Sequence, residues 1–257
     1  DLHFVDDMFF TGSGTIELNR RKLRFGSKEM TVNAPLYFDQ AQDIELNSNV
    51  HLASTWTCSS ECIVEGNGKI LYLENGGNVV VEKGSSLLLR DMTIRGVSEN
   101  NIRCLDNFST LSFQGVTWIQ DGNYSFTNGS FDVISKIKVV GGTTFAYKST
   151  QQSRILSKAK ISFDNGMTFS YDPASASGDL ILLTDETSKF CLNGATLYST
   201  ATGLQLTKGI LQIMGNSCLT SEAAVEDEGI AFGDGVSSDN DLRIEIFPGA
   251  KMRITAG

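Results

Sequence analysis

The five cysteines are the residues of this sequence with the most evident chemistry. Cys58 and Cys62 lie four positions apart in a segment rich in Ser and Thr. They can close a small disulfide loop if their Cα atoms come within about 4.4–6.8 Å. We predict this disulfide, with two free thiols or a metal site as the alternatives. A zinc site needs two more ligands, and His3 and His51 stand at no ligand spacing.

An odd number of cysteines leaves at least one thiol unpaired or paired between chains. The sequence leaves the pairing of Cys104, Cys191 and Cys218 open.

Catalytic motifs are absent from the sequence. It contains no Gly-x-Ser-x-Gly elbow, no phosphate-binding loop and no Cys/His metal array. The two histidines are far apart, and we interpret each as a surface or hydrogen-bonded residue, not as half of a catalytic dyad. We therefore expect a protein that is not an enzyme and that holds no cofactor and no metal.

Carboxylates concentrate in the segment 222–241, which includes Glu226-Asp227-Glu228 and Asp239. Dense oxygen ligands are what calcium prefers, but this spacing fits neither an EF-hand nor the glycine-rich calcium nonapeptide. We interpret the segment as a solvated acidic loop, with calcium binding left open.

Charge and hydropathy exclude two classes of partner. The formal net charge is −9, so the surface as a whole repels nucleic acid and anionic membranes. No run approaches 18 apolar residues, so we expect no membrane insertion. Asp1 is not an initiator residue, and we expect that a leader was removed or that the chain is a fragment.

An internal repeat is the strongest structural signal. Two alternating apolar residues, a turn rich in Gly, Asn and Asp, and a Thr flanked by apolar residues recur with a period in the twenties. The copies are 87–94, 111–118, 137–145, 161–169, 190–197 and 211–219. Their Thr positions are 93, 117, 144, 168 and 196, with Cys218 in the last copy. A constant period built from strands predicts a stacked solenoid.

Stacking of the copies predicts two inward ladders, because alternate strand residues point to one face. The first is Leu87, Leu111, Ile137, Ile161, Phe190, Leu211; the second is Ile94, Trp118, Phe145, Phe169, Leu197, Leu219. The Thr column points outward. At about 4.8 Å per coil, roughly ten coils give a rod about 50 Å long.

The repeat also places the carboxylates that glycoside hydrolysis would need. Asp91 and Asp164 fall in the turn column three coils apart, about 14 Å at the strand spacing, with Gly115 and Gly141 as their neighbours in that column. Paired catalytic carboxyls stand about 5–9.5 Å apart. Arg90 and Arg95 flank Asp91, but no column of carboxylates stands beside them. This arrangement favours a protein without glycosidase or lyase activity.

Over roughly Ile44 to Leu219, the repeat resembles that of the pectin-lyase-like right-handed parallel β-helix superfamily. Its members include polysaccharide lyases and hydrolases, phage tailspikes and bacterial surface adhesins. Of the Asn-Thr-Asp, Asp-Asp, Gly-His-Gly and Arg-Ile-Lys motifs of polygalacturonase-like members, only Asp6-Asp7 has a match, and it lies outside the repeat. The resemblance implies an all-β, right-handed β-helix of roughly ten coils and no particular activity.

We divide the chain into residues 1–43 (N-terminal coils, cap or assembly segment), 44–221 (regular solenoid) and 222–257 (acidic loop and final coil). The function we expect is that of an extracellular or cell-surface structural protein, a subunit of a fibre or an adhesin. The alternative is a glycan-binding or glycan-cleaving β-helix, such as a tailspike or a polysaccharide lyase.

Both ends of the sequence are apolar strands without an evident cap. The candidate assembly residues are Phe4, Val5, Met8, Phe9 and Phe10 at one end and Met252 and Ile254 at the other. Open solenoid ends expose unpaired backbone groups and invite pairing. We therefore predict a homo-oligomer or filament formed by end-to-end contact, with an intramolecular lid formed by Phe4 to Phe10 as the alternative.

Overall fold

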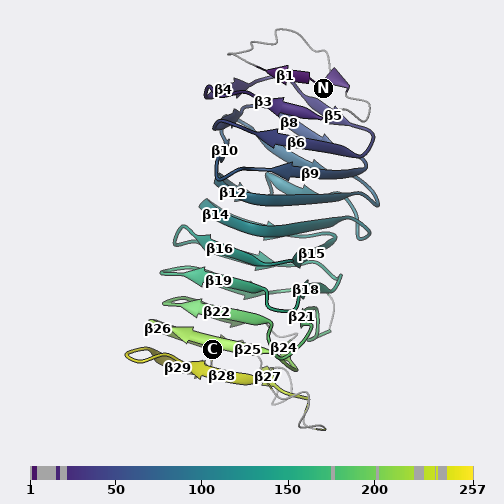
Figure 1. Cartoon of the computed structure of the whole chain (residues 1–257). Coiled ribbons are helices and arrows are strands. Elements are labelled where there is room, and N and C mark those ends of the chain that lie inside the picture. The colour runs from purple at the N-terminus through teal and green to yellow at the C-terminus, as the bar shows by residue number, and fades with distance from the viewer. Residues whose placement is uncertain are drawn as a thin grey trace.

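The computed structural model describes residues 22–174, 177–200, 203–222, 229–234, 236 and 242–256, together with the backbone of 2–4 and 16–17. In this part of the chain every regular element is a β-strand, and all the strand pairs are parallel. The strands wind into an elongated parallel β-solenoid of about nine turns, which confirms the predicted fold class (Figure 1).

Each turn contributes strands to three faces. The first face begins at the N-terminus and runs the length of the rod. It consists of β1 (Leu2–Phe4), β3 (Leu23–Phe25), β6 (Gln42–Leu46), β9 (Glu61–Glu65), the start of β12 (Ser86–Glu99), the start of β14 (Thr110–Phe126), β15 (Ser130–Val133), β18 (Ser153–Ile155), β21 (Ile181–Leu183), β24 (Leu204–Leu206) and β27 (Ile230–Phe232).

The second face follows the first across a corner. It consists of β4 (Met30–Val32), β7 (Val50–Leu52), β10 (Ile70–Leu73), the middle of β12 and β14, β16 (Lys136–Val140), β19 (Lys160–Asp164), β22 (Lys189–Asn193), β25 (Ile210–Met214) and β28 (Arg243–Ile246).

The third face completes each turn. It consists of β2 (Ile16–Glu17), β5 (Leu36–Phe38), β8 (Thr55–Cys58), β11 (Asn78–Val81), β13 (Ile102–Cys104), the end of β14, β17 (Thr144–Tyr147), β20 (Thr168–Tyr171), β23 (Thr196–Ser199), β26 (Asn216–Ser221) and β29 (Lys251–Ala256). Strands that precede residue 44 therefore stack on the same three faces as those that follow it.

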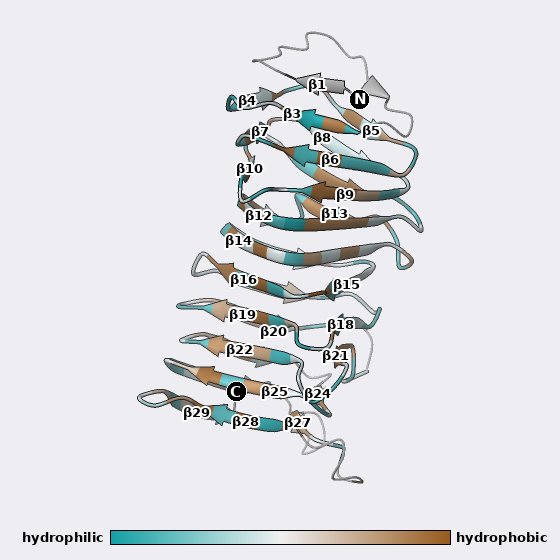
Figure 2. Ribbon diagram, in the orientation of Figure 1, coloured by the Kyte–Doolittle hydropathy of each residue, from teal (hydrophilic) through white to brown (hydrophobic). Residues whose placement is uncertain are grey.

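Alternation along each strand fills one continuous core. Apolar and polar residues alternate along the strands in Figure 2, and every residue of the two predicted ladders is buried, with Trp118 and Phe169 fully enclosed. Aromatic rings stack between coils, as in the pair Tyr147 and Tyr171, whose ring centroids lie 5.9 Å apart. The prediction from alternation that these residues point into the core is thus confirmed.

The predicted membership of these ladders is wrong at one step. Leu111 pairs with Phe131 rather than with Ile137, and Trp118 pairs with Val139 rather than with Phe145. The reason is that β15, whose sequence has neither the Gly nor the Thr of the repeat, supplies the first-face strand of the next coil.

The repeated motif therefore forms the turn at two different corners of the solenoid. In its first two copies the turn residue, Asp91 or Gly115, lies between the first and second faces, with φ of 46° and 70°. In the later copies Gly142, Gly166 and Gly194 lie between the second and third faces. A tight turn into the left-handed region, for which Gly is preferred, suits either corner.

The Thr residues consequently form two groups instead of one column. Thr93 and Thr117 pair on the second face, whereas Thr144, Thr168 and Thr196 stack on the third. All five are half-buried.

Candidate functional site

Three regions of the described chain gather side chains that bear on function: the outer surface of the first coils, the corner that holds Cys58 and Cys62, and the C-terminal end of the rod.

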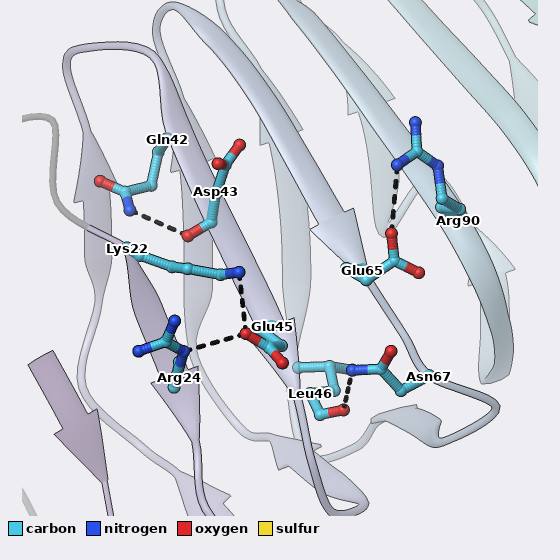
Figure 3. Close-up of polar contacts among 9 residues, drawn as sticks. All are labelled: Lys22, Arg24, Gln42, Asp43, Glu45, Leu46, Glu65, Asn67 and Arg90. Carbon is cyan, nitrogen blue, oxygen red and sulfur yellow. Dashed lines mark hydrogen bonds and ion pairs between the residues drawn. The ribbon is translucent and has the colours of Figure 1, made fainter. Parts of the chain in front are cut away.

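On the outer surface of the first face, two acidic side chains on adjacent coils, Glu45 and Glu65, are flanked by basic side chains on the coils beyond them (Figure 3). Glu45 accepts contacts from Lys22 at 2.9 Å and from Arg24 at 3.0 Å. Two coils further along, Arg90 contacts Glu65 at 3.2 Å. We call Arg24, Glu45, Glu65 and Arg90 the balanced column, because every charge in it has an opposite neighbour. Such exposed pairs each contribute about 0–1 kcal/mol to stability. The column therefore favours the observed pairing of neighbouring coils more than it adds to their stability.

On the second face, His51 lies between two carboxylates from the coils on either side. Its Nε2 lies 2.7 Å from Glu29 and its Nδ1 lies 3.0 Å from Glu74. A neutral imidazole donates through only one nitrogen, so this geometry requires the doubly protonated ring. Partial burial by itself lowers the pKa of His51, but the hydrogen bonds to Glu29 and Glu74 outweigh it and raise the pKa above its usual value.

Next to His51 lies a shallow hollow of about 210 Å³, lined by Tyr72, Glu74, Arg95 and Asp121. Ligand pockets commonly combine aromatic side chains with a few polar or charged groups that fix the orientation of the ligand. Here one face of Tyr72 is covered by His51, whose ring lies 4.3 Å away and nearly parallel. Glu74 is engaged by the same histidine. The hollow thus offers no free aromatic platform on that side and no unpaired Glu74.

The prediction that His51 is a surface or hydrogen-bonded residue is confirmed, but its partners Glu29 and Glu74 were not predicted. The signal is present in the sequence at the period of the coil: Glu29, His51 and Glu74 are separated by about one turn each. This separation places the three side chains next to one another only because it equals the length of one coil, and the coil boundaries were not known from the sequence.

The prediction that Asp91 and Asp164 share one turn column is wrong. Asp91 occupies the corner between the first and second faces, with Gly115 stacked directly on it, as predicted. Asp164 instead ends β19 on the second face and contacts Lys138 at 2.8 Å. Gly141 packs on the backbone of Gln120, not on Gly115. The two aspartates therefore do not share a column, because the repeat changes corner between them.

Cys58 and Cys62 meet at the corner between β8 and β9, but as free, buried thiols. The prediction that they lie together is confirmed, and the disulfide between them is absent. A hydrogen bond between the two thiols, together with full burial, raises the pKa of Cys58 well above its usual value. A neutral, enclosed thiol is a poor nucleophile and a poor metal ligand, so this pair serves as packing in the core. Cys104, Cys191 and Cys218 are also free.

No group of three or more His, Cys, Asp or Glu residues able to hold a metal occurs among the described residues. Most of the acidic segment 222–241, including Glu226-Asp227-Glu228 and Asp239, lies outside them. No helix in the described part of the chain is long and apolar enough to cross a membrane.

The last coil that the structure describes has a neighbouring coil on one side only. Strands β27, β28 and β29 each pair with the preceding coil, and their other edges have no partner in the described chain. Their apolar side chains continue the inward ladders but face the end of the rod: Ile254 is 68% exposed and Ile246 is 53% exposed. Ile230, Phe232 and Ile254 border a hollow of about 170 Å³ at this end.

Of the predicted assembly residues, Ile254 is therefore exposed, and Met252 is partly buried against the core. Phe4 lies in β1, which pairs with β3, but its side chain is outside the described residues. Val5, Met8, Phe9 and Phe10 lie wholly outside them.

No family model, no curated protein sequence and no solved structure matches this chain. The fold itself, a parallel β-solenoid, is compatible with the β-helix fold that the repeat resembles.

Proposed function

We propose that this protein is an extracellular structural subunit that stacks end to end with other copies into a surface fibre. The observation that carries the proposal is the open C-terminal coil. Its strands present unpaired backbone edges beside exposed Ile246 and Ile254, whose partners in the preceding coil, Ile213 and Leu219, are buried.

Unpaired edges over an apolar end invite the addition of another β-strand layer. A second copy whose first coil has the same three-sided outline would add parallel strands to each of the three faces. Contact between two different ends of identical subunits is heterologous, and it propagates into a filament instead of closing on itself. The extracellular setting rests on an exterior rich in uncharged polar residues and not on a disulfide.

The test is the concentration dependence of particle length for the chain 1–257. Sedimentation velocity and negative-stain images are expected to show rods that lengthen as the protein concentration rises. A charge at the open end, in the double variant Ile246→Asp and Ile254→Asp, is expected to leave single folded rods.

The control is Thr255→Asp, compared with the single variant Ile254→Asp; it introduces the same single charge at the neighbouring, outward position of β29. It is expected to assemble nearly as well as the unchanged protein. An intact protein that stays monomeric at high concentration rules out end-to-end assembly.

A further inference from the structure

Asn-Gly pairs are the places in this chain where a spontaneous covalent change is easiest, because Asn is chemically labile and Gly has no side chain to shield its backbone nitrogen. All five pairs lie between strands or at the end of one, and the φ angles of their glycines run from 66° to 91°. The pairs are Asn67-Gly68, Asn75-Gly76, Asn128-Gly129, Asn165-Gly166 and Asn193-Gly194. As dipeptides the five are equivalent.

The reaction takes place within one pair and needs only water. The backbone nitrogen of Gly attacks Cγ of the Asn side chain and forms a C–N bond, while the bond from Cγ to Nδ2 breaks and ammonia leaves with the proton of the glycine N–H. Water then opens the five-membered ring at either carbonyl group, which leaves Asp or isoaspartate. Because the attack is intramolecular, its rate depends on how readily the two groups meet.

Three of the pairs are protected by hydrogen bonds between coils. The N–H of Gly68 donates to the carbonyl oxygen of Asp91 at 2.6 Å. The N–H of Gly166 donates to Gly194 at 3.1 Å, and that of Gly194 donates to Met214 at 2.7 Å. Each acceptor belongs to the following coil, so the attack requires a contact between coils to open first.

The fourth pair is protected by packing. Gly129 is buried, and Asn128 is half-buried. A Cβ on Gly129 would lie 2.5 Å from the carbonyl oxygen of Ser109 and 2.8 Å from Cβ of Cys104, so the backbone there is tightly enclosed. Ring closure at this pair would require the corner to unpack.

The pair Asn75-Gly76 has neither kind of protection. It forms the turn between β10 and β11, and both residues are exposed. The carbonyl oxygen of Gly76 accepts a hydrogen bond from Asn78. Within the described chain, however, the N–H of Gly76 and the side chain of Asn75 have no hydrogen-bond partner. Apart from its chain neighbours, no atom lies within 4 Å of the place that a Cβ on Gly76 would take.

Little holds this turn closed. Asn75 has the left-handed backbone of a tight turn, with φ of 49°, so the turn must open before the side chain reaches the nitrogen of Gly76. One hydrogen bond spans it, from the N–H of Gly77 to the carbonyl oxygen of Glu74 at 2.8 Å, and both residues belong to the same coil. The turn also borders a polar hollow of about 310 Å³ through which water reaches it. It can therefore open without separating two coils.

We propose that Asn75 is a modification site, at which the folded chain undergoes ring closure onto Gly76 and hydrolysis to a mixture of Asp and isoaspartate. The product adds a negative charge beside Glu74, which contacts His51 at 3.0 Å, and isoaspartate also lengthens the main chain by a methylene group. The site lies on the side of the rod, between the second and third faces. The inference therefore goes beyond the proposed stacking function and does not depend on it.

The experiment follows all five pairs in the folded chain 1–257 during storage in mildly alkaline buffer. Peptide mapping by mass spectrometry detects conversion as a mass gain equal to the difference between water and ammonia, and fragmentation distinguishes isoaspartate from Asp. Asn75 is expected to convert at least about fivefold faster than any other Asn of these pairs, because the others must first break a hydrogen bond between coils or unpack a corner. A parallel sample in concentrated urea gives the rate of each pair without the fold. The ratio of the rate in urea to the rate in the folded chain is expected to be smallest for Asn75.

Two matched variants identify the residue that carries the change. Asn75→Gly and Asn67→Gly both place Gly at a left-handed position, with φ of 49° and 51°, so both are expected to fold. The first is expected to remove the earliest product, and the second to leave it unchanged. Conversion of any other pair in the folded chain as fast as that of Asn75 would overturn the proposal. So would an Asn75 that stays unmodified while the sample in urea reacts. None of these outcomes bears on whether the protein forms fibres.

Discussion

The central coils and the last coil have the same strand pattern but opposite exposure. On the second face, Phe163, Leu192 and Ile213 are fully buried, whereas Ile246, which pairs with Ile213 in the next coil, is 53% exposed. On the third face, Leu219 is 2% exposed and its partner Ile254 is 68% exposed. The sequence alternates in the same way at all these positions.

What distinguishes the two regions is the presence of a coil on both sides. An inward residue of a solenoid is enclosed only when the coils above and below it are in place, because each coil buries its neighbour's apolar side. The exposed residues of the last coil are core residues that lack one layer. Apolar patches of this kind mark interaction surfaces more often than isolated exposed residues do.

The largest effect is expected from a charge placed in this ladder at a closed coil. Phe163→Asp is expected to cost more than about 5 kcal/mol and to abolish folding, because it removes a buried ring and introduces an unpaired charge. Ile246→Asp, on the same face in the last coil, is expected to cost about 1 kcal/mol or less. Urea unfolding followed by far-ultraviolet circular dichroism measures both. Similar losses at the two positions would contradict the comparison.

An intermediate effect is expected at His51, which joins closed coils on the outside. Its raised pKa means that its contribution to stability is fully present below the ordinary value of 6.5 and is lost as pH rises through the folded value. The hydrogen bond from His51, and then that from Asn49, lowers the pKa of Glu29. The contribution of Glu29 is therefore present above its ordinary value of 4.5 and is lost as pH falls through the folded value.

The difference in stability between the unchanged protein and His51→Gln is accordingly expected to be greatest near about pH 5.5–6 and to shrink at alkaline pH. Urea midpoints across this range, with an NMR titration of the ring protons, measure it. A titration midpoint of His51 below 6.5 would contradict the two-carboxylate geometry.

The smallest effects are expected at outward positions of the closed coils. Lys138 and Ser162 lie next to buried Val139 and Phe163, but their own side chains point to solvent. The variants are Lys138→Ala and Ser162→Ala. Each is expected to change stability by less than about 0.5–1 kcal/mol, since exposed ion pairs such as that of Lys138 with Asp164 contribute little. Thermal unfolding of the two variants measures this. A large loss at either position would mean that the outer surface, and not the ladder, holds the closed coils together.

Much of this architecture could be predicted from the sequence because the relevant interactions are local. Alternation of apolar and polar residues decides which side of a strand is buried, and this holds for Trp118, Phe113 and Phe163. The Gly and Asp residues of the repeat mark the corners because they accept a left-handed backbone, as Asp91 and Gly115 do. These signals sufficed for a parallel solenoid.

The tertiary structure decided what depends on register between coils. One local motif fits two corners, so the sequence alone did not show that Leu111 stacks on Phe131. The same uncertainty hid the His51 cluster, whose members are about one turn apart in sequence and meet only when the length of each turn is fixed. Whether a side chain is buried depends on the alternation within its own strand. Which side chain of the next coil it stacks on depends on the number of residues in the loops between the two strands.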